Sequence, residues 1–205
     1  VHLLANSSKI DFGREIIPDA FKHKLTYAFT YKGYWRDIGT MKSFYEENLM
    51  LTDSLPKIDM FDEYWPFFTR SRNLPPTKMK ASHVEDSIIS NGCIIEGATI
   101  KHSVIGLRSR IGKNSKVEDS IVLGCDYYEA LGEIEQNKLS KIPSMGIGEG
   151  CHIKKAIVDK NARIGNNVKI INKNNITHKD SGDIFIRDGI VIVTKKALIK
   201  DNTVI

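Results

Sequence analysis

A six-residue pattern recurs along the second half of the chain and limits the folds available to it. The hexads "VEDSII", "IKHSVI", "VEDSIV" and "IKKAIV" begin at Val84, Ile100, Val117 and Ile153; each has aliphatic residues at positions one, five and six and a small residue at position four. The first three begin 16 and 17 residues apart, and the fourth follows after 36, which is about two units with an interruption. Such a period is typical of solenoids, in which each repeat buries its apolar face by stacking on its neighbours.

The spacing of aliphatic residues along these repeats predicts the kind of solenoid. They fall six residues apart, with one step of five in each of two runs. Coils of about 16 to 18 residues with three short sides form a parallel β-helix of triangular section, in which each side points one aliphatic residue inward. The segments "IGKNSK", "IGEGCH" and "IGNNVK" fit its corners, because Gly, Asn and Ser tolerate tight turns and positive φ. The predicted inward positions are Ile88, Ile94, Ile100, Ile105, Ile111, Val117, Leu123, Ile147, Ile153, Val158, Ile164 and Ile170.

Two segments depart from the hexads. Residues 124–146, "GCDYYEALGEIEQNKLSKIPSMG", are polar, and we expect a loop that leaves the β-helix. The final stretch, "IFIRDGIVIVTKKALIKDNTVI", alternates aliphatic residues around Gly189 and predicts a further coil or a closing sheet. The β-helix domain is therefore predicted over residues 81–205, with an inserted loop at 124–146.

The first 80 residues have a different character. Residues 1–55 combine helical spacing behind "DFGRE", strand-like alternation in "LTYAFTY", and a helical face from Met41 to Leu51 with Thr40 as the expected N-cap. This pattern predicts an α/β segment. Residues 56–80 carry four prolines and five aromatic side chains, which exclude a long helix and predict an inter-domain linker packed onto a surface. These are Pro56, Pro66, Pro75 and Pro76, and Phe61, Tyr64, Trp65, Phe67 and Phe68.

Composition narrows the classes of partner. The formal charge of +5 comes from 30 Lys and Arg against 25 Asp and Glu, spread along the chain, which favours anionic small molecules and gives only weak support to nucleic acid. We expect no nucleic-acid partner. Cys93, Cys125 and Cys151 lie far apart without a CxxC pair, so a reducing compartment is expected, with neither a zinc ribbon nor a disulfide framework. No apolar run is long enough to cross a bilayer, and we expect no membrane partner.

Two aspartates raise a choice between capping and chemistry. Asp37, in "GYWRDIGT", either caps the helix that follows Gly39, pairs with Arg36, or binds a metal ion. A single carboxylate does not complete a metal site, so a metal role requires a second carboxylate from elsewhere. Asp11, in "DFGREIIP", either caps a helix or lines a pocket together with Phe12.

Other polar residues have weaker signals. His102 and His152 lie within coils, where acyltransferases of the hexapeptide-repeat class place a general base, so an acyl-transfer function is an alternative. Six basic residues are solvated charges unless folding brings some of them together, in which case they would bind a phosphate or sulfate. They are Arg70, Arg72, Arg108, Arg110, Lys160 and Lys195.

Several segments, taken in order, resemble one enzyme family. "DFGREIIP", "GYWRDIGTMKSFYEENLML", "LPPTK", "HSVIGLRSRI", "LGCDYYE", "CHIKKAIVDKNARIGNNVKIINK" and "DGIVIVTKKALIKDNTVI" have the order and spacing found in ADP-glucose pyrophosphorylase, also called glucose-1-phosphate adenylyltransferase, of cyanobacteria and plants. The resemblance implies the synthesis of ADP-glucose and pyrophosphate from ATP and glucose 1-phosphate, for glycogen or starch. It also implies the fold, namely the α/β remnant of a Rossmann-like nucleotidyltransferase domain followed by a left-handed parallel β-helix.

The resemblance assigns roles to residues of the first segment. Asp37 matches a carboxylate that binds Mg²⁺ together with an Asp from the earlier half of the catalytic domain, and Asp11, Phe12 and Trp35 match positions that shape the sugar-nucleotide pocket. The Gly-rich phosphate loop of the family is absent here, so we expect this chain alone to be inactive and further sequence to precede Val1.

The resemblance also implies regulation and assembly. Lys160 and Lys195 match two activator-site lysines, and Arg70 and Arg72 match a segment that contributes to an anion site; the expected effectors are 3-phosphoglycerate and phosphate. A homotetramer or heterotetramer is expected, in bacterial cytoplasm or in a plastid. Two alternatives remain open, namely a non-catalytic regulatory subunit of the same enzyme and, with less support, the hexapeptide-repeat acyltransferase.

Overall fold

The computed structural model describes residues 8–205, which form two compact units divided between Trp35 and Arg36. The first unit contains a π-helical turn, Phe12–Ile16, that continues into helix α2, Ile17–His23. Asp11 caps this turn, because its Oδ1 accepts a hydrogen bond from the backbone N–H of Arg14 at 2.7 Å. The expected helix behind "DFGRE" is therefore confirmed, with Asp11 as its cap.

The strand predicted for residues 25–31 is wrong. This stretch has no strand, and Leu25, Tyr27 and Phe29 are each at least 86% exposed. An extended segment becomes a strand only when a neighbour satisfies its backbone groups, and the described part of this unit offers no other strand. Alternation of apolar and polar residues alone was therefore not sufficient to predict a strand.

The second unit begins with helix α3, Met41–Met50, which is confirmed together with its cap. Thr40 Oγ1 accepts a hydrogen bond from the backbone N–H of Ser43, and Ser43 Oγ accepts one from the backbone N–H of Thr40. The buried side chains of Tyr45 and Leu49 pack against apolar residues of the β-helix, including Ile121. Helix α3 thus belongs with the β-helix, whereas the predicted domain boundary at residues 55/56 stays a prediction.

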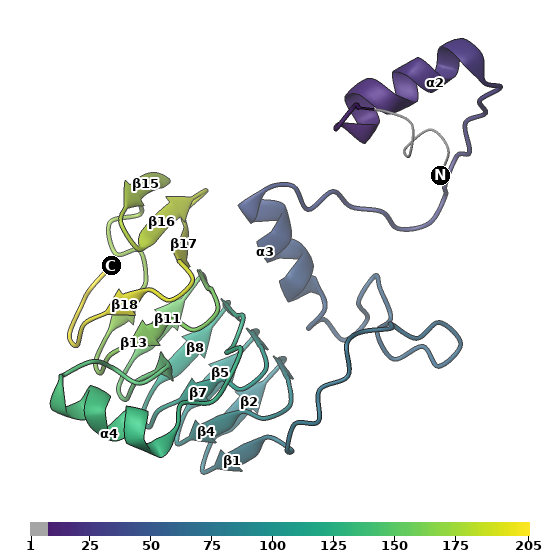
Figure 1. Cartoon of the computed structure of the whole chain (residues 1–205). Coiled ribbons are helices and arrows are strands. Elements are labelled where there is room, and N and C mark those ends of the chain that lie inside the picture. Colours follow the sequence, from purple (N-terminus) through teal and green to yellow (C-terminus); the bar gives the residue numbers. More distant parts are fainter. Residues whose placement is uncertain (1–7) are drawn as a thin grey trace. The chain divides into compact units, whose positions relative to one another are not determined.

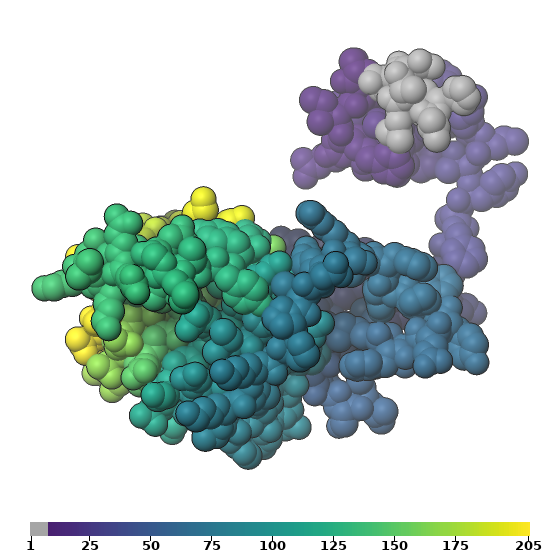
Figure 2. Space-filling model, turned by 60° about the horizontal axis from the view of Figure 1, so that its bottom comes forward, coloured from purple at the N-terminus to yellow at the C-terminus, as the bar shows by residue number. Residues whose placement is uncertain are grey.

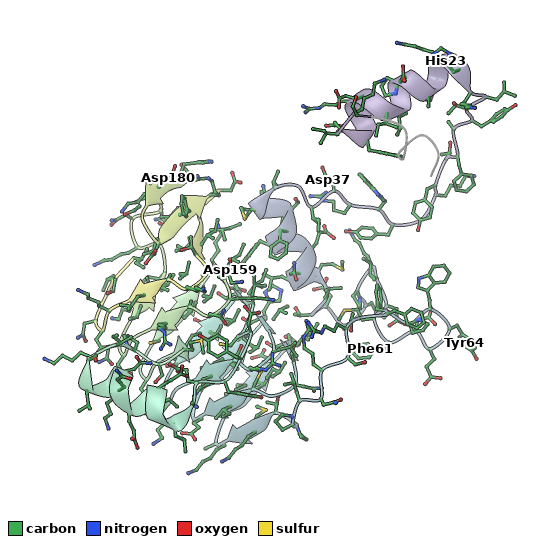
Figure 3. The ribbon with its side chains drawn as sticks, viewed as in Figure 1. His23, Asp37, Phe61, Tyr64, Asp159 and Asp180 are labelled. Carbon is green, nitrogen blue, oxygen red and sulfur yellow. The ribbon has the colours of Figure 1, made fainter. Side chains whose placement is uncertain are left out.

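The predicted linker, residues 56–80, has no helix or strand before β1 (Lys78–Lys80), and its packing differs from the prediction. Its large aromatic side chains were expected to pack onto a surface, but Phe61, Tyr64, Trp65 and Phe68 are between 77% and 96% exposed. Figure 3 shows Phe61 and Tyr64 on this irregular segment. The segment forms short turns, in which Asp59 and Asp62 accept the backbone N–H groups of Phe61 and Tyr64.

The remainder of the second unit is a parallel β-helix with three sheets (Figure 1). The first sheet contains β1 (Lys78–Lys80), β4 (Ile94–Glu96), β7 (Arg110–Ile111), β10 (Gly146–Ile147), β13 (Arg163–Ile164) and β18 (Leu198–Ile199). The second contains β2 (His83–Glu85), β5 (Thr99–Lys101), β8 (Lys116–Glu118), β11 (His152–Lys154) and β14 (Lys169–Ile170). The third contains β3 (Ile88–Ile89), β6 (Val104–Ile105), β9 (Ile121–Val122), β12 (Ala156–Val158), β17 (Ile190–Val193), β16 (Ile184–Arg187) and β15 (His178–Ser181).

The core of the β-helix follows the predicted period, with a phase error at three positions. Nine of the predicted inward residues, such as Ile100, Ile105 and Val117, are buried. Ile88, Ile94 and Leu123 are only half-buried; Ile95 and Val122 are buried in the core instead, and Ile89, itself half-buried, packs against it. In "II" and "IV" pairs the aliphatic pattern alone does not show which residue points inward, because steps of five and six both occur.

The corners use the expected residue types. Asn114, Gly150 and Asn167, from the three segments assigned to corners, all have positive φ. The small residue of the hexad has a second role. Ser87, Ser103 and Ser120 lie on successive coils, and each Oγ accepts a hydrogen bond from the backbone N–H of the equivalent residue on the following coil. These bonds help to hold adjacent coils in register.

The insertion at residues 124–146 is more ordered than a loop, because it contains helix α4, Leu131–Leu139. In Figure 2 the insertion, in green, lies on the outside of the coils. The carboxylate of Glu129 is almost fully buried, accepts a hydrogen bond from the backbone N–H of Met145 at 2.7 Å, and pairs with Arg163.

The C-terminal segment forms both structures expected for it, a closing sheet and a further coil. Strands β15, β16 and β17 form an antiparallel sheet, while β17 and β18 complete further coils.

Candidate functional site

One corner of the β-helix carries charged residues at the same place on successive coils. This corner joins the third sheet to the first, and it comprises the turn after β6, the start of the insertion after β9, and the turns after β12 and β17. The pairing of Val158 with Val193 places Lys160 and Lys195 at equivalent positions of adjacent coils. The backbone bond from the N–H of Lys196 to the carbonyl of Lys160 continues that register.

A cavity of about 440 Å³ lies beside this corner, and linker residues 70–74 form part of its wall. Four cationic side chains line it, from Arg70, Arg72, Arg108 and Lys160, against the single carboxylate of Asp126. A surplus of positive charge in a concave surface attracts anions. Within residues 8–205, a larger cavity of about 500 Å³ beside α4 has three basic and three acidic residues in its wall, so the corner cavity has the stronger preference for anions.

Asp126 connects the two lysines of the corner. Its Oδ1 lies 3.3 Å from Lys160 Nζ, and its Oδ2 lies 3.4 Å from Lys195 Nζ. Asn161 donates a hydrogen bond from Nδ2 to Oδ2 of Asp126 at 2.9 Å and accepts one from the Asp126 backbone N–H. The hydrogen bond from Asn161, followed by the contacts with the two lysines, lowers the pKa of Asp126 to about 2, so its carboxylate is charged at neutral pH.

Arg108 is held in the cavity wall by backbone and aromatic contacts. Its Nη1 donates to the carbonyl of Cys125 at 3.3 Å, and its guanidinium carbon lies 5.7 Å from the centre of the Tyr128 ring. The Tyr128 hydroxyl in turn donates to the Gly92 carbonyl at 2.9 Å. In the described part of the chain, Arg70, Arg72 and Arg108 form no ion pair with a carboxylate, so their charges face the cavity region uncompensated.

The four residues predicted for an effector site are thus brought together. Arg70, Arg72 and Lys160 line one cavity, and Lys195 joins them through Asp126. Of the two further cations considered from the sequence, Arg108 lines this cavity and Arg110 lines the cavity beside α4. Asp126 was not predicted from the sequence, although a signal existed. "AIVDKNA" and "VIVTKKA" align as two copies of one coil, which places Lys160 beside Lys195 and creates a need for a counter-ion.

Asp37 precedes α3 (Figure 3) and neither caps that helix nor pairs with Arg36. Its Oδ1 accepts the backbone N–H of Gly39 at 2.9 Å, in a local turn, while Arg36 pairs with Glu46 and Glu47. Asp37 is exposed. Asp11, Phe12 and Trp35 belong to the first unit, where Phe12 and Trp35 are 57% and 75% exposed and Asp11 serves as the cap.

The described residues supply only part of the ligands that a magnesium site needs. Mg²⁺ in phosphate chemistry is held by one or two carboxylates together with phosphate oxygens, and the exposed carboxylate of Asp37 has the right donor chemistry for one of them. Among residues 8–205, however, no group of three or more His, Cys, Asp or Glu side chains is arranged to hold a metal ion. Asp37 therefore fits as a ligand, not as a complete site.

The two histidines considered for acyl transfer are bound to carboxylates of adjacent coils. His102 Nδ1 lies 2.8 Å from Asp119 Oδ1, and His152 Nε2 lies 2.6 Å from Glu118 Oε2. Both pairs are half-exposed and bridge neighbouring coils. They act as links in the outer surface of the β-helix.

Comparison with known families covers nearly the whole chain. Residues 72–204 match the family described as the GLGC left-handed parallel beta-helix domain, and residues 2–54 match the nucleotidyl transferase family. The β-helix is therefore left-handed, as predicted.

In the described residues, no helix has the length and apolar character needed to span a membrane.

Proposed function

Because the chain belongs to the family of the GLGC left-handed parallel β-helix domain, we propose that it is part of a nucleotidyltransferase that forms ADP-glucose from ATP and glucose 1-phosphate. The observation that carries this proposal is the order of the two matches, with a nucleotidyl transferase segment leading into the β-helix. An acyltransferase would have no need of the first segment. The segment resemblance to ADP-glucose pyrophosphorylase supplies the choice of nucleotide and sugar.

In the proposed reaction a phosphate oxygen of glucose 1-phosphate attacks the α-phosphorus of ATP. The bond between the α-phosphorus and the bridging oxygen breaks, and pyrophosphate leaves with that oxygen. Asp37 would provide one carboxylate to Mg²⁺, which when bound offsets negative charge on the phosphates. Asp11, Phe12 and Trp35 would shape the pocket for the sugar nucleotide.

The corner cavity is proposed as the binding site for an anionic effector such as 3-phosphoglycerate or phosphate. Arg70, Arg72, Lys160 and Lys195 would bind its oxygens through charge-assisted hydrogen bonds. The proposed active form is a homotetramer or heterotetramer of such chains.

The test is an assay of the full-length product of the gene that encodes this chain. With ATP, glucose 1-phosphate and Mg²⁺, we expect release of pyrophosphate and ADP-glucose. Asp37→Asn removes one negative charge and keeps a side chain able to form the turn with Gly39. We expect kcat to fall by about 100-fold or more, because a metal ligand that offsets transition-state charge contributes several kcal/mol.

Asp59→Asn is the matched control. Asp59 accepts the backbone N–H of Phe61 at 2.8 Å, in the same type of turn as Asp37, and it has no proposed role in catalysis. Equal turnover in the Asp37 and Asp59 variants would remove Asp37 from the metal site. A full-length protein that binds the effector but turns over none of the nucleoside triphosphates would instead identify the regulatory subunit.

A further inference from the structure

We propose that Asp126 is a built-in competitor of the effector, occupying the place between Lys160 and Lys195 that an oxyanion of the ligand would take. The inference rests on the anion site proposed above and adds a residue that sets its affinity and selectivity. A ligand would bind by displacing one carboxylate from two ammonium groups.

The geometry is that of a bridging oxyanion. Each carboxylate oxygen of Asp126 faces a different lysine, at 3.3 Å and 3.4 Å. Lys160 and Lys195 occupy equivalent positions on adjacent coils, where neighbouring strands are about 4.8 Å apart, so their like charges repel in the absence of an anion. A phosphate or carboxylate group of a ligand has the same oxygen chemistry as Asp126 and suits the same position.

The contacts of Asp126 allow it to be displaced. Its side chain is 41% exposed, and those of Lys160 and Lys195 are 44% and 52% exposed. Exposed ion pairs of this kind contribute little to stability, because water screens the charges. A ligand that also reaches Arg70, Arg72 or Arg108 gains contacts that Asp126 does not make, because those cations have no carboxylate partner in the described residues.

This arrangement selects for ligands with more than one negative charge. A monoanion that replaces Asp126 merely exchanges one charge for another at the two lysines. A dianion retains a second charge for the arginines of the same cavity. Removing the Asp126 charge should therefore tighten binding and reduce the discrimination between dianions and monoanions.

The experiment measures binding of inorganic phosphate to the full-length protein by isothermal titration calorimetry. Asp126→Asn preserves the size of the side chain and a carbonyl oxygen for the Asn161 hydrogen bond, and we expect it to bind phosphate about fivefold more tightly, since a weak competing ion pair is lost. The control is Asp180→Asn. Asp180 pairs with Arg187 on the antiparallel sheet (Figure 3), so it matches the change in net charge outside the cavity. We expect its affinity to stay within about twofold of the wild type.

Lys195→Gln separates failure of the inference from failure of the site. If Lys195→Gln weakens phosphate binding while Asp126→Asn leaves it unchanged or weaker, the competitor role is overturned and the anion site stands. If neither Lys160→Gln nor Lys195→Gln alters phosphate binding, the anion site itself is wrong. Circular dichroism of each variant confirms that the comparison is between folded proteins.

Discussion

A single small side chain, that of Ser87, Ser103 or Ser120, links each of three successive coils of the β-helix to the next. Ser103 is fully buried; its Oγ donates to the Lys101 carbonyl at 2.7 Å and accepts the backbone N–H of Ser120 at 3.1 Å. The hexad therefore needs a small residue at its fourth position for two reasons, namely space at the corner and an acceptor for a buried N–H. The chain of serines ends at Ala156, which accepts no such bond and itself donates its N–H to Ser120.

Replacement of Ser103 by Ala should expose the cost of that lost acceptor. The Ser120 N–H would remain buried without its bond from Oγ, and we expect the free energy of unfolding to fall by about 1–3 kcal/mol. Urea denaturation monitored by circular dichroism measures the change. Ser54→Ala, at an exposed position, is the control and should change stability by less than about 0.5 kcal/mol. Equal stability of the two variants would contradict the structural role of the serine.

At the scale of residues, the sequence predicted which residue types occupy the corners of the coils, but it did not predict which charged side chains pair with one another. Gly and Asn at the corners followed from their tolerance of positive φ, which is a property of the residue itself. The pairing of Asp126 with Lys160 and Lys195 depends on coils that are distant along the chain, because the insertion separates Asp126 from Lys160 and a hairpin separates Lys160 from Lys195. The metal-binding role of Asp37 was assigned by resemblance alone, because Asp side chains form the same kind of local turn in loops that bind no ligand.

At the scale of elements, helix α3 is attached to the β-helix by a narrow contact. The Tyr45 hydroxyl donates to the carbonyl of Asp119, and Leu49 is buried beside it. Burial, followed by the nearby charge of Asp119, raises the pKa of Tyr45 well above its usual range. The tyrosine is therefore neutral at ordinary pH and serves as a hydrogen-bond donor.

The raised pKa of Tyr45 predicts an alkaline weakening of this contact. The folded protein holds the Tyr45 proton more tightly than the unfolded chain, so the stabilising contribution is fully present below pH of about 10 and is lost as pH rises above it. Tyr45→Phe should lower stability by about 0.5–1.5 kcal/mol at pH 7, and its deficit should shrink between about pH 10 and 11. Urea denaturation across this pH range is the measurement. Tyr64→Phe, at a 96% exposed position, should follow the wild type throughout.

Elements with local signals were predicted, and those that depend on distant contacts were not. The helix at residues 41–50 carries its own cap in Thr40 and Ser43. The stretch at 25–31 has strand-like alternation but no strand to pair with, and the aromatic residues of the linker have no surface under them in the described units. The helix within the insertion was missed because its two half-buried positions, Ile134 and Asn137, give almost no apolar periodicity.

At the scale of the molecule, the stack of coils tolerates interruption because each coil contacts only its neighbours. Strands β7 and β10 pair directly, Ile111 with Ile147, although the insertion separates them in sequence. The hairpin before β17 interrupts the stack in the same way, and Ile157 still pairs with Ile192. The hexad period was therefore sufficient to predict the domain, while the insertions were visible only as gaps in it.

Removal of most of the insertion should leave the β-helix folded. The carboxylate of Glu129 lies 2.7 Å from the backbone N–H of Met145, so a Gly-Ser-Gly linker is long enough to replace residues 130–144. We expect a loss of about 1–3 kcal/mol, because Ile134 and Ile142 are only partly covered and α4 has no buried residue. By contrast, Ile153→Ala, at a fully buried position of a central coil, should cost about 2–5 kcal/mol, as much as or more than removal of the helix. Cooperative urea unfolding with an unchanged β-sheet signal is the expected result for the shortened chain, and loss of that signal would show that the insertion is required for the coils to stack.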